Sequence, residues 1–265
     1  LLFHPNGAEF ISSSRDTTVR IWSFDNTEEL RRFEGHSGNV YDIELTSDAQ
    51  SVLSAGDNRV LLWNYETLEI ALTLENFGNQ ISTRSLAISP DDKTFVTGLN
   101  NGVIILWDIA TGEEIRRLAG HTDDVITLEF SADGQFLFSG SNDRRIRLWD
   151  IATGETIRIY NGHIAPVSDV TVTADNHYLL SASEDNTLRY WDIASGELIR
   201  EFRGHTGQIF DASLSDNGSI AYTASADGSV IGWRISVDAV MAWLSENRYQ
   251  RTLTPEELSS YELSF

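Results

Sequence analysis

Short apolar runs that alternate with polar positions recur along the chain with a period of about 42 residues. Six of these runs close on a tryptophan. They read VRIW, VLLW, IILW, IRLW, LRYW and VIGW, and end at Trp22, Trp63, Trp107, Trp149, Trp191 and Trp233. A single unit of this length cannot bury its own apolar surface, so copies must stack and share a core. The period therefore predicts a repeat protein.

Within one unit, from residue 113 to 151, four alternating runs are separated by turn signals such as Asp133-Gly134. Alternation with a period of two is typical of half-buried strands, and Asp-Gly favours a tight hairpin turn. Each unit is therefore expected to form a four-stranded antiparallel sheet. Sheets of this kind arrange radially as the blades of a propeller, so we predict an all-β β-propeller over residues 1–235.

Recurrent dipeptides give the repeat a family resemblance. Gly-His occurs at 35–36, 120–121, 162–163 and 204–205, and Trp-Asp occurs at 107–108, 149–150 and 191–192. With an Asp six residues before most of the tryptophans, these motifs resemble those of WD40 (WD-repeat) proteins over about residues 1–235. The resemblance implies a propeller of four-stranded blades that presents surfaces for protein interaction.

Four units carry a His, a Ser or Thr, an Asp and a Trp at similar spacing. The sets are His36/Ser54/Asp57/Trp63, His121/Ser139/Asp143/Trp149, His163/Ser181/Asp185/Trp191 and His205/Thr223/Asp227/Trp233. These residue types could form a hydrolase triad, but a nucleophile is needed once and the set occurs four times. The resemblance implies a hydrogen-bond chain within each blade. We therefore expect a structural network and no catalytic residue.

The third unit departs from this pattern. It reads Asn76-Phe77-Gly78-Asn79-Gln80 where Gly-His is expected, with two extra residues, and Asn101 holds the Asp position. If the His and the Asp of a unit are hydrogen-bonded to each other, the two are expected to be lost together, because either one alone would be a buried, unsatisfied group. A decayed blade is one interpretation. The other is an altered loop at the propeller mouth, in which Phe77 and Arg84 contact a partner.

Side chains at repeat positions that face the mouth are the candidate binding residues. They are Arg15, Tyr41, Arg84, Asn100, Asn142, Glu184 and Phe210, together with Phe77 of the altered loop. Aromatic and arginine side chains are the usual anchors of protein interfaces, whereas the alternative for each position is ordinary surface. We expect a non-catalytic scaffold or sensor. Hydrolase or lyase chemistry, and binding of a small ligand or cation in the central channel, are the alternative functions.

Charge and composition limit the classes of partner and cofactor that we expect the protein to bind. Forty acidic residues against nineteen basic ones give a net charge of −21, which repels phosphate backbones and anionic lipid. We therefore expect no nucleic acid and no membrane partner. The chain has no cysteine, and its His, Asp and Glu show no metal-ligand spacing, so we expect no metal or other cofactor. It also has no run of about 18 apolar residues and no signal-peptide layout, so a cytoplasmic location is expected.

Beyond Ile235 the period changes to helical spacing. Apolar residues recur at Val237, Val240, Met241 and Leu244, and residues 254–257 read as a capping box. We predict a short helical extension over residues 236–265 that packs on the propeller. Its sequence resembles the C-terminus of bacterial multidomain WD-repeat proteins, in which the propeller accompanies a signalling ATPase, a kinase or a caspase-like protease. That resemblance implies a partner that is another protein or the protein's own upstream signalling module.

The two ends of the repeat do not match. Residues 1–7 align with residues 128–134, part-way along an inner strand, and no fourth strand follows Ile235. An unclosed sheet edge would expose unpaired backbone groups. We therefore expect six blades within this chain and favour seven in the ring of the parent protein.

Overall fold

The fold is that of a computed structural model, which describes residues 1–57, 59–75 and 81–235. The altered loop around Phe77 and the helical extension predicted over residues 236–265 lie outside these described residues. All regular structure within them is β-strand. The strands are β1 (Leu2–Phe3), β2 (Glu9–Ser13), β3 (Thr18–Ser23), β4 (Glu29–Glu34), β5 (Val40–Leu45), β6 (Ser51–Gly56), β7 (Arg59–Asn64), β8 (Ile70–Glu75), β9 (Thr83–Ile88), β10 (Thr94–Leu99), β11 (Val103–Asp108), β12 (Glu114–Ala119), β13 (Val125–Phe130), β14 (Phe136–Ser141), β15 (Ile146–Asp150), β16 (Thr156–Tyr160), β17 (Val167–Val172), β18 (Tyr178–Ser183), β19 (Thr187–Asp192), β20 (Leu198–Arg203), β21 (Ile209–Leu214), β22 (Ile220–Ser225) and β23 (Val230–Arg234).

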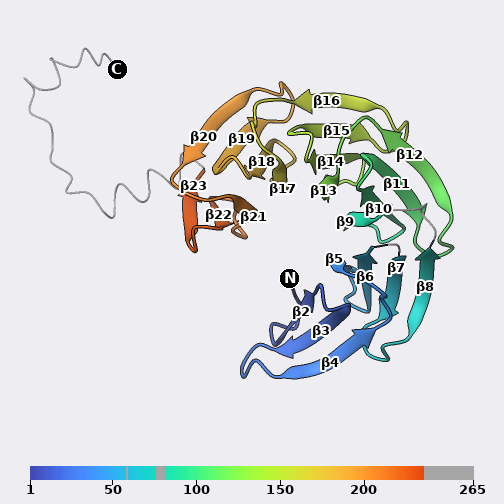
Figure 1. Ribbon diagram of the computed structural model, residues 1–265. Coiled ribbons are helices and arrows are strands. Elements are labelled where there is room, and N and C mark those ends of the chain that lie inside the picture. Colours follow the sequence, from blue (N-terminus) through green and yellow to red (C-terminus); the bar gives the residue numbers. More distant parts are fainter. Residues whose placement is uncertain (58, 76–80, 236–265) are drawn as a thin grey trace, which may run out of the picture.

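Consecutive strands pair antiparallel and form six sheets, which we number as blades 1 to 6. Blades 1 to 5 have four described strands each, and blade 6 has β21, β22 and β23. Figure 1 shows the blades as an open arc around a common axis, with β5, β9, β13, β17 and β21 innermost and blades 1 and 6 at its two ends. The prediction of an all-β propeller with six blades in this chain is confirmed.

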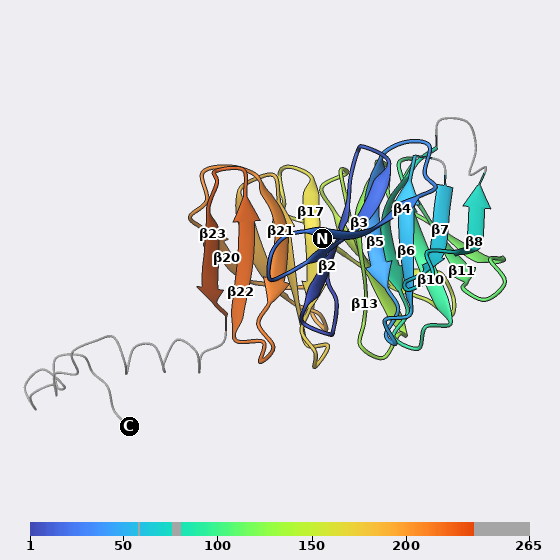
Figure 2. The ribbon, with the colours of Figure 1, turned by 90° about the horizontal axis from the view of Figure 1, so that it is seen from below.

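The strands run roughly along the propeller axis, so the loops gather on two faces (Figure 2). Each innermost strand follows a Gly-His turn or its equivalent and leads to a hairpin on the opposite face. We call the face with the Gly-His turns the mouth face, and the other the lower face. In the lower hairpins one residue adopts a left-handed backbone, as at Asp92 (φ 55°), Gly134 (φ 68°) and Asn176 (φ 56°). Asn, Asp and Gly tolerate this conformation best, which explains the turn residues of the repeat.

The core lies between neighbouring blades. One cluster joins Ile11, Val19 and Phe33 of blade 1 to Val52 and Trp63 of blade 2, and each of these side chains is at most 2% exposed. Complete burial of one such side chain contributes about 1.5–3 kcal/mol. A blade therefore gains most of its stability from the next blade, as the repeat pattern predicts.

Candidate functional site

In blades 4, 5 and 6 the four polar residues of the repeat form one hydrogen-bond chain. In blade 4, His121 Nδ1 donates to Asp143 Oδ2 at 2.8 Å, and His121 Nε2 is 2.7 Å from the hydroxyl of Ser139. Trp149 Nε1 donates to the same hydroxyl at 2.8 Å. The corresponding contacts of blades 5 and 6 measure 2.7–3.0 Å and join His163/Ser181/Asp185/Trp191 and His205/Thr223/Asp227/Trp233.

These chains are closed to substrate. Ser139 and Ser181 are 0% exposed, and Thr223 is 1% exposed. A nucleophile must reach its substrate, whereas each of these hydroxyls is bonded to the His and the Trp of its own blade. Burial alone would raise the pKa of Asp143, but the hydrogen bond and charge of His121 outweigh it and lower that pKa. The aspartate therefore stays ionised and holds the histidine in place.

Blade 2 does not form the complete chain that the sequence predicts. His36 Nε2 contacts Ser54 at 2.7 Å and Trp63 donates to Ser54 at 2.8 Å, but His36 Nδ1 has no hydrogen-bond partner among the described residues. Asp57 instead accepts from the Asn39 amide at 3.0 Å and from the Tyr41 hydroxyl at 2.7 Å. The predicted link between His36 and Asp57 is therefore wrong.

The physical reason is the length of the turn. Asp57 follows Ser54 by three residues, whereas Asp143 follows Ser139 by four. The shorter turn keeps the carboxylate from His36 and directs it toward the mouth. Burial, together with the charge of Arg59, lowers the pKa of His36 to about 4, so this histidine is neutral at physiological pH.

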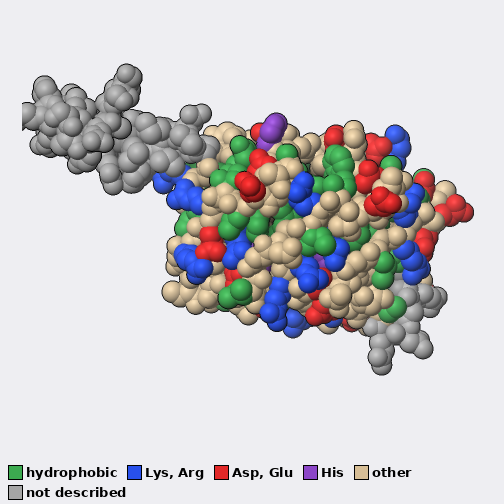
Figure 3. Space-filling view, turned by 90° about the horizontal axis from the view of Figure 1, so that it is seen from above, with side chains coloured by type: hydrophobic (Ala, Val, Ile, Leu, Met, Phe, Trp, Pro, Cys, Tyr) green, Lys and Arg blue, Asp and Glu red, His purple; other side chains and the backbone are tan. Residues whose placement is uncertain are grey.

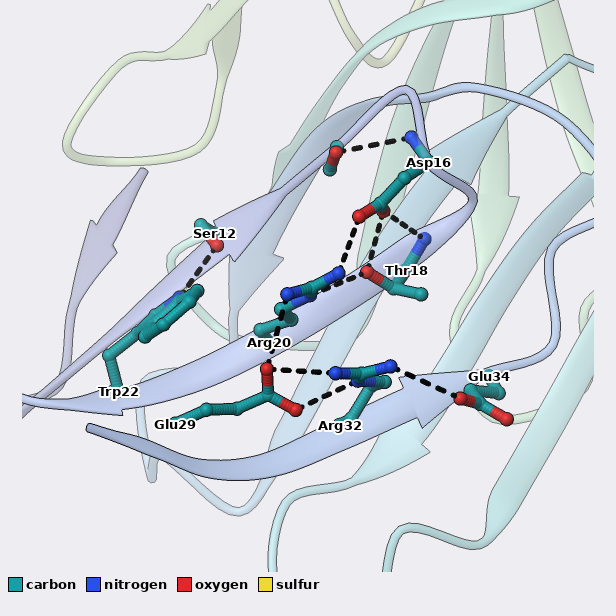
Figure 4. Close-up of polar contacts among 9 residues, drawn as sticks. Ser12, Asp16, Thr18, Arg20, Trp22, Glu29, Arg32 and Glu34 are labelled. Carbon is teal, nitrogen blue, oxygen red and sulfur yellow. Dashed lines mark hydrogen bonds and ion pairs between the residues drawn. The ribbon is translucent and has the colours of Figure 1, made fainter. Parts of the chain in front are cut away.

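Blades 1 and 3 use other residues at these positions. In blade 1, Asp16 accepts from Thr18 and from Arg20, and Arg20 also contacts Glu29 at 3.2 Å (Figure 4). An arginine therefore bonds the repeat aspartate where blades 4, 5 and 6 use a histidine. In blade 3, Trp107 donates to Thr97 at 3.0 Å, and Asn101 caps its own turn by accepting from the Val103 amide.

Two of the predicted mouth residues come together. The Arg84 guanidinium carbon lies 4.3 Å from the centroid of the Tyr41 ring, and Arg84 Nε is 3.2 Å from Asp124 Oδ2. With the bond from Tyr41 to Asp57, this gives a continuous row of contacts across blades 2, 3 and 4. We call Asp57, Tyr41, Arg84 and Asp124 the mouth row.

The other predicted residues are dispersed. Asn100 accepts from the Ser82 amide at 3.1 Å, and Glu184 accepts from Gln208 at 3.0 Å. Asn142 is half-buried, and its backbone N–H donates to the Asp124 backbone carbonyl. Arg15 is exposed, and Phe210 is 56% exposed at the inner strand of blade 6. Phe77 lies outside the described residues.

The central channel contains carboxylates that the sequence-based prediction missed. A cavity of about 370 Å³ is lined by Tyr41, Arg84 and Phe210, and five acidic residues also line it: Asp42, Glu44, Glu129, Asp169 and Asp211. Among its described lining residues Arg84 is the single base. The signal was present, because Asp42, Asp169 and Asp211 occupy the same position of their inner strands.

Two of these carboxylates join neighbouring blades. Asp42 Oδ2 accepts from the Leu86 amide at 2.7 Å, and Asp169 accepts from the Ala212 amide at 2.9 Å and from Thr127 at 3.0 Å. Burial raises the pKa of Asp42 to about 6 even though these amides favour the charged form. The inner strands are thus tied to one another through the channel wall.

The two glutamates have no such amide from a neighbouring blade. Burial raises the pKa of Glu129 to about 7, and burial together with the charges of Asp42 and Glu129 raises that of Glu44 to about 8. The channel therefore holds protons near neutral pH.

Among the described residues, no group of three or more His, Cys, Asp or Glu side chains could hold a metal ion. The described part of the chain also contains no helix long and apolar enough to cross a membrane.

Similarities to known proteins agree with this geometry. The chain is 27% identical over 133 residues to mouse pre-mRNA-processing factor 19, 31% over 134 residues to mouse pre-mRNA-processing factor 17, and 31% over 125 residues to GID complex subunit 7 of Schizosaccharomyces pombe. These matches cover 49%, 49% and 44% of this chain, and 26%, 23% and 24% of the relatives, so the chain spans about a quarter of their length.

The model of the WD40 family, described as "WD domain, G-beta repeat", matches residues 1–23, 27–64, 73–108, 112–150, 154–192 and 196–234. Each segment contains the three inner strands of one blade, and the later segments also include all or part of the outer strand of the preceding blade, so the six repeats give the six blades. Together the segments include most of the chain. The protein therefore belongs to the WD40 family of β-propellers.

Proposed function

We propose that this WD40 propeller is a non-catalytic scaffold that binds a protein partner at its mouth, through Tyr41, Arg84 and Phe210. The observation that carries the proposal is the mouth row. Arg84 is stacked on Tyr41 and held by Asp124, so its orientation is fixed before a partner arrives. Preorganised arginine and aromatic side chains lose little entropy on binding, which is why they dominate interface energies.

The mouth row coincides with the absence of the His–Asp hydrogen bond in blade 2. Asp57 supports Tyr41 instead of His36, and His36 Nδ1 is left buried without a partner in the part of the chain that the structure describes. An unsatisfied buried donor or acceptor costs about 1–3 kcal/mol. A cost of this size at a position where three other blades are satisfied supports a binding role for the residues that Asp57 holds.

Buried hydroxyls support the absence of catalysis at the repeated polar sets, because Ser54, Ser139 and Ser181 are each 0% exposed. The net charge of −21 disfavours nucleic acid and anionic lipid as partners. We further propose that the chain is the sensor or scaffold part of a larger, cytoplasmic bacterial signalling protein. The support for this context is the sequence of residues 236–265, which resembles the C-terminus of such proteins.

A second candidate function is binding of a small ligand or a cation in the channel. The observation that favours it is the cavity of about 370 Å³ with five acidic residues in its wall. Two of the five, Asp42 and Asp169, already accept hydrogen bonds from neighbouring strands. We therefore rank it below protein binding.

Site-specific photo-crosslinking tests the proposed mouth interface. A benzophenone amino acid replaces Phe210, which is 56% exposed at the mouth, or Phe24, which is equally exposed at the rim. The proposal predicts one discrete crosslinked protein in the native host from position 210 and none from position 24. Crosslinks from position 24 alone would place the interface on the rim.

A further inference from the structure

On the lower face, the hairpins of neighbouring blades follow a pairing rule. In each of these hairpins, one residue, which we call the first position, lies next to the hairpin of the following blade. In blades 1 to 5 this residue is Pro5, Ser47, Pro90, Ala132 and Ala174. The position opposite, in the next blade, holds Ala49, Asp92, Gly134, Asn176 and Gly218. Where an N–H is available, an acidic or amide side chain accepts it: the Ser47 amide donates to Asp92 at 3.1 Å, and the Ala132 amide donates to Asn176 at 3.0 Å.

Where the first position is a proline, no N–H exists and the opposite residue has no acceptor side chain. Pro90 meets Gly134 in this way, and a Cβ on Gly134 would lie 3.3 Å from the Pro90 ring. The rule fails once, between blades 5 and 6. The Ala174 amide is available but faces Gly218, which has no atoms within 4 Å of its Cβ direction. Within the described residues, this amide has no hydrogen-bond partner.

An open slot results at this interface. A pocket of about 320 Å³ is lined by Ala174, Asp175, Asp216 and Gly218, and by the rings of Tyr178 and Tyr190. It shares lining residues with a pocket of about 410 Å³ that reaches Glu129 at the lower end of the channel. The slot therefore runs from the channel to the tyrosine pair.

The tyrosine pair occurs in one blade. The ring centroids of Tyr178 and Tyr190 lie 4.9 Å apart at 33°, and both side chains are half-buried. The matching positions of blade 4 hold Phe136 and Leu148. Neither tyrosine hydroxyl bonds a described residue. Two rings flanked by carboxylates from two blades form a surface that attracts a cation through both the ring faces and the acidic charges.

Each of the two hairpins at the slot carries a carboxylate. Hydrogen bonds from Thr173 and from the His177 amide lower the pKa of Asp175, and Asp216 is exposed on the opposite hairpin. His177 is exposed and borders the slot, with its Nδ1 3.4 Å from Asp175 Oδ2 and its ring centroid 6.3 Å from that of Tyr178. The slot thus combines an unused backbone donor with an aromatic and acidic wall.

We propose that this slot between blades 5 and 6 binds an extended peptide segment, with a main-chain carbonyl on the Ala174 amide and a guanidinium or methylated ammonium side chain on Tyr178 and Tyr190. This site lies on the face opposite the mouth, and its existence does not depend on the mouth interface. Both cations fit the same chemistry, because each presents a diffuse positive charge to an aromatic face.

Direct titration tests the site. Tyrosine-ring ¹³C-labelled protein is titrated with N-acetyl-arginine methylamide, N-acetyl-trimethyllysine methylamide and the neutral N-acetyl-citrulline methylamide. We expect saturable shifts of the Tyr178 and Tyr190 signals with at least one cationic probe, and the stronger of the two identifies the cation. Citrulline should bind at least about tenfold more weakly. Absence of saturation with both cations, or equal affinity for citrulline, overturns the proposal.

Two variants locate the binding. Tyr190→Leu restores the residue type of blade 4 and should weaken binding about tenfold, whereas Tyr222→Leu, at an exposed tyrosine of blade 6, should leave it unchanged. Gly218→Asn copies Asn176, which adopts the same left-handed backbone, and should close the slot by accepting from Ala174. It should abolish binding while raising the melting temperature. Unchanged binding by a folded Tyr190→Leu or Gly218→Asn protein contradicts the assignment.

Discussion

At the scale of single residues, the structure explains why arginine supplies nearly all of the positive charge. Lys93 is the only lysine. Arginines on the outer strands donate to carbonyls of the next blade, as Arg31 does to Tyr65 at 3.0 Å and Arg116 to Thr153 at 2.6 Å. A planar guanidinium can bond a carbonyl and lie against apolar surface at once, which an ammonium group cannot do. On the rim, basic and acidic side chains are interspersed (Figure 3).

The polar chains make a prediction for single aspartates. Asp143→Ala removes the partner of a buried histidine, so it should lower the free energy of unfolding by about 1–3 kcal/mol. Asn101→Ala should cost less, because Asn101 only caps its own turn. Urea denaturation of both variants measures the difference. Equal losses would show that the aspartate of blade 4 stabilises nothing beyond its turn.

Arg147 makes a second prediction at this scale. It is 8% exposed and lies over Trp149, and it forms no ion pair among the described residues. Its counterpart Arg189 contacts Glu201 on the neighbouring strand at 2.8 Å, whereas Arg147 faces Ile159. Ile159→Glu should therefore stabilise the protein by about 0.5–1 kcal/mol, since Ile159 is already 40% exposed.

Ile159→Gln is the control for that substitution, because it has nearly the same shape without the charge. The gain should appear in thermal melts at low salt and shrink at high salt. If Ile159→Glu and Ile159→Gln change the melting temperature equally, an added negative charge beside Arg147 does not stabilise the protein.

At the scale of strands and turns, contacts between blades hold the elements in register. Arg158 donates from two nitrogens to the carbonyls of Ser195 and Ala194, each at 2.7 Å. Arg158→Lys cannot reach both carbonyls and should lower the free energy of unfolding by about 1 kcal/mol. Arg200 occupies the same position in blade 5 but lies over Phe202, 4.6 Å from the ring centroid, so Arg200→Lys is the matched control. Similar losses in chemical denaturation would contradict the account of these interblade contacts.

The elements were largely predictable from the sequence, because period, alternation and turn residues are local signals. The four strands expected between residues 113 and 151 are present as β12 to β15. The expectation that they form one sheet is wrong, because β12 is the outer strand of blade 3 and β13, β14 and β15 belong to blade 4. The failure in blade 2 came from counting residue types. His36 and Asp57 are both present, but the turn in blade 2 is one residue shorter than in blade 4, as the spacing already shows. The consequence, a carboxylate bonded to Asn39 and Tyr41 instead of His36, required the structure.

Contacts between blades were harder to predict. Asp42 bonds an amide 44 residues away, and Ala132 bonds Asn176 at the same separation. Such pairs are set by how far each blade rotates about the axis, which no local pattern encodes. These contacts between blades can be identified only once the positions of neighbouring sheets are known.

At the scale of the whole molecule, the acidic channel should make stability depend on pH. Burial raises the pKa of Glu44 to about 8 and of Glu129 to about 7, from an ordinary value of 4.5. The folded state then binds more protons than the unfolded state between about pH 5 and pH 8. The stabilising contribution is present below this window and is lost as the pH rises through it.

Glu44→Gln/Glu129→Gln should remove that dependence. The double variant should gain several kcal/mol in unfolding free energy relative to the parent protein at pH 8.5, and little at pH 4. Urea melts across this range provide the measurement, with the exposed pair Glu155→Gln/Glu197→Gln as control. Parallel pH profiles for the parent and the channel variant would show that these glutamates titrate normally.

The central claim is that the mouth of the propeller binds a protein, and one comparison tests it most directly. The triple variant Tyr41→Ala/Arg84→Ala/Phe210→Ala is compared with Phe24→Ala/Arg117→Ala/Tyr222→Ala, a control variant that removes the same residue types from exposed positions outside the mouth. Affinity for the partner identified by crosslinking is measured with both purified proteins. The account predicts at least a hundredfold loss, roughly 3 kcal/mol, for the mouth variant alone, with nearly unchanged melting temperatures. Full affinity of the mouth variant, with loss in the control variant, would contradict it.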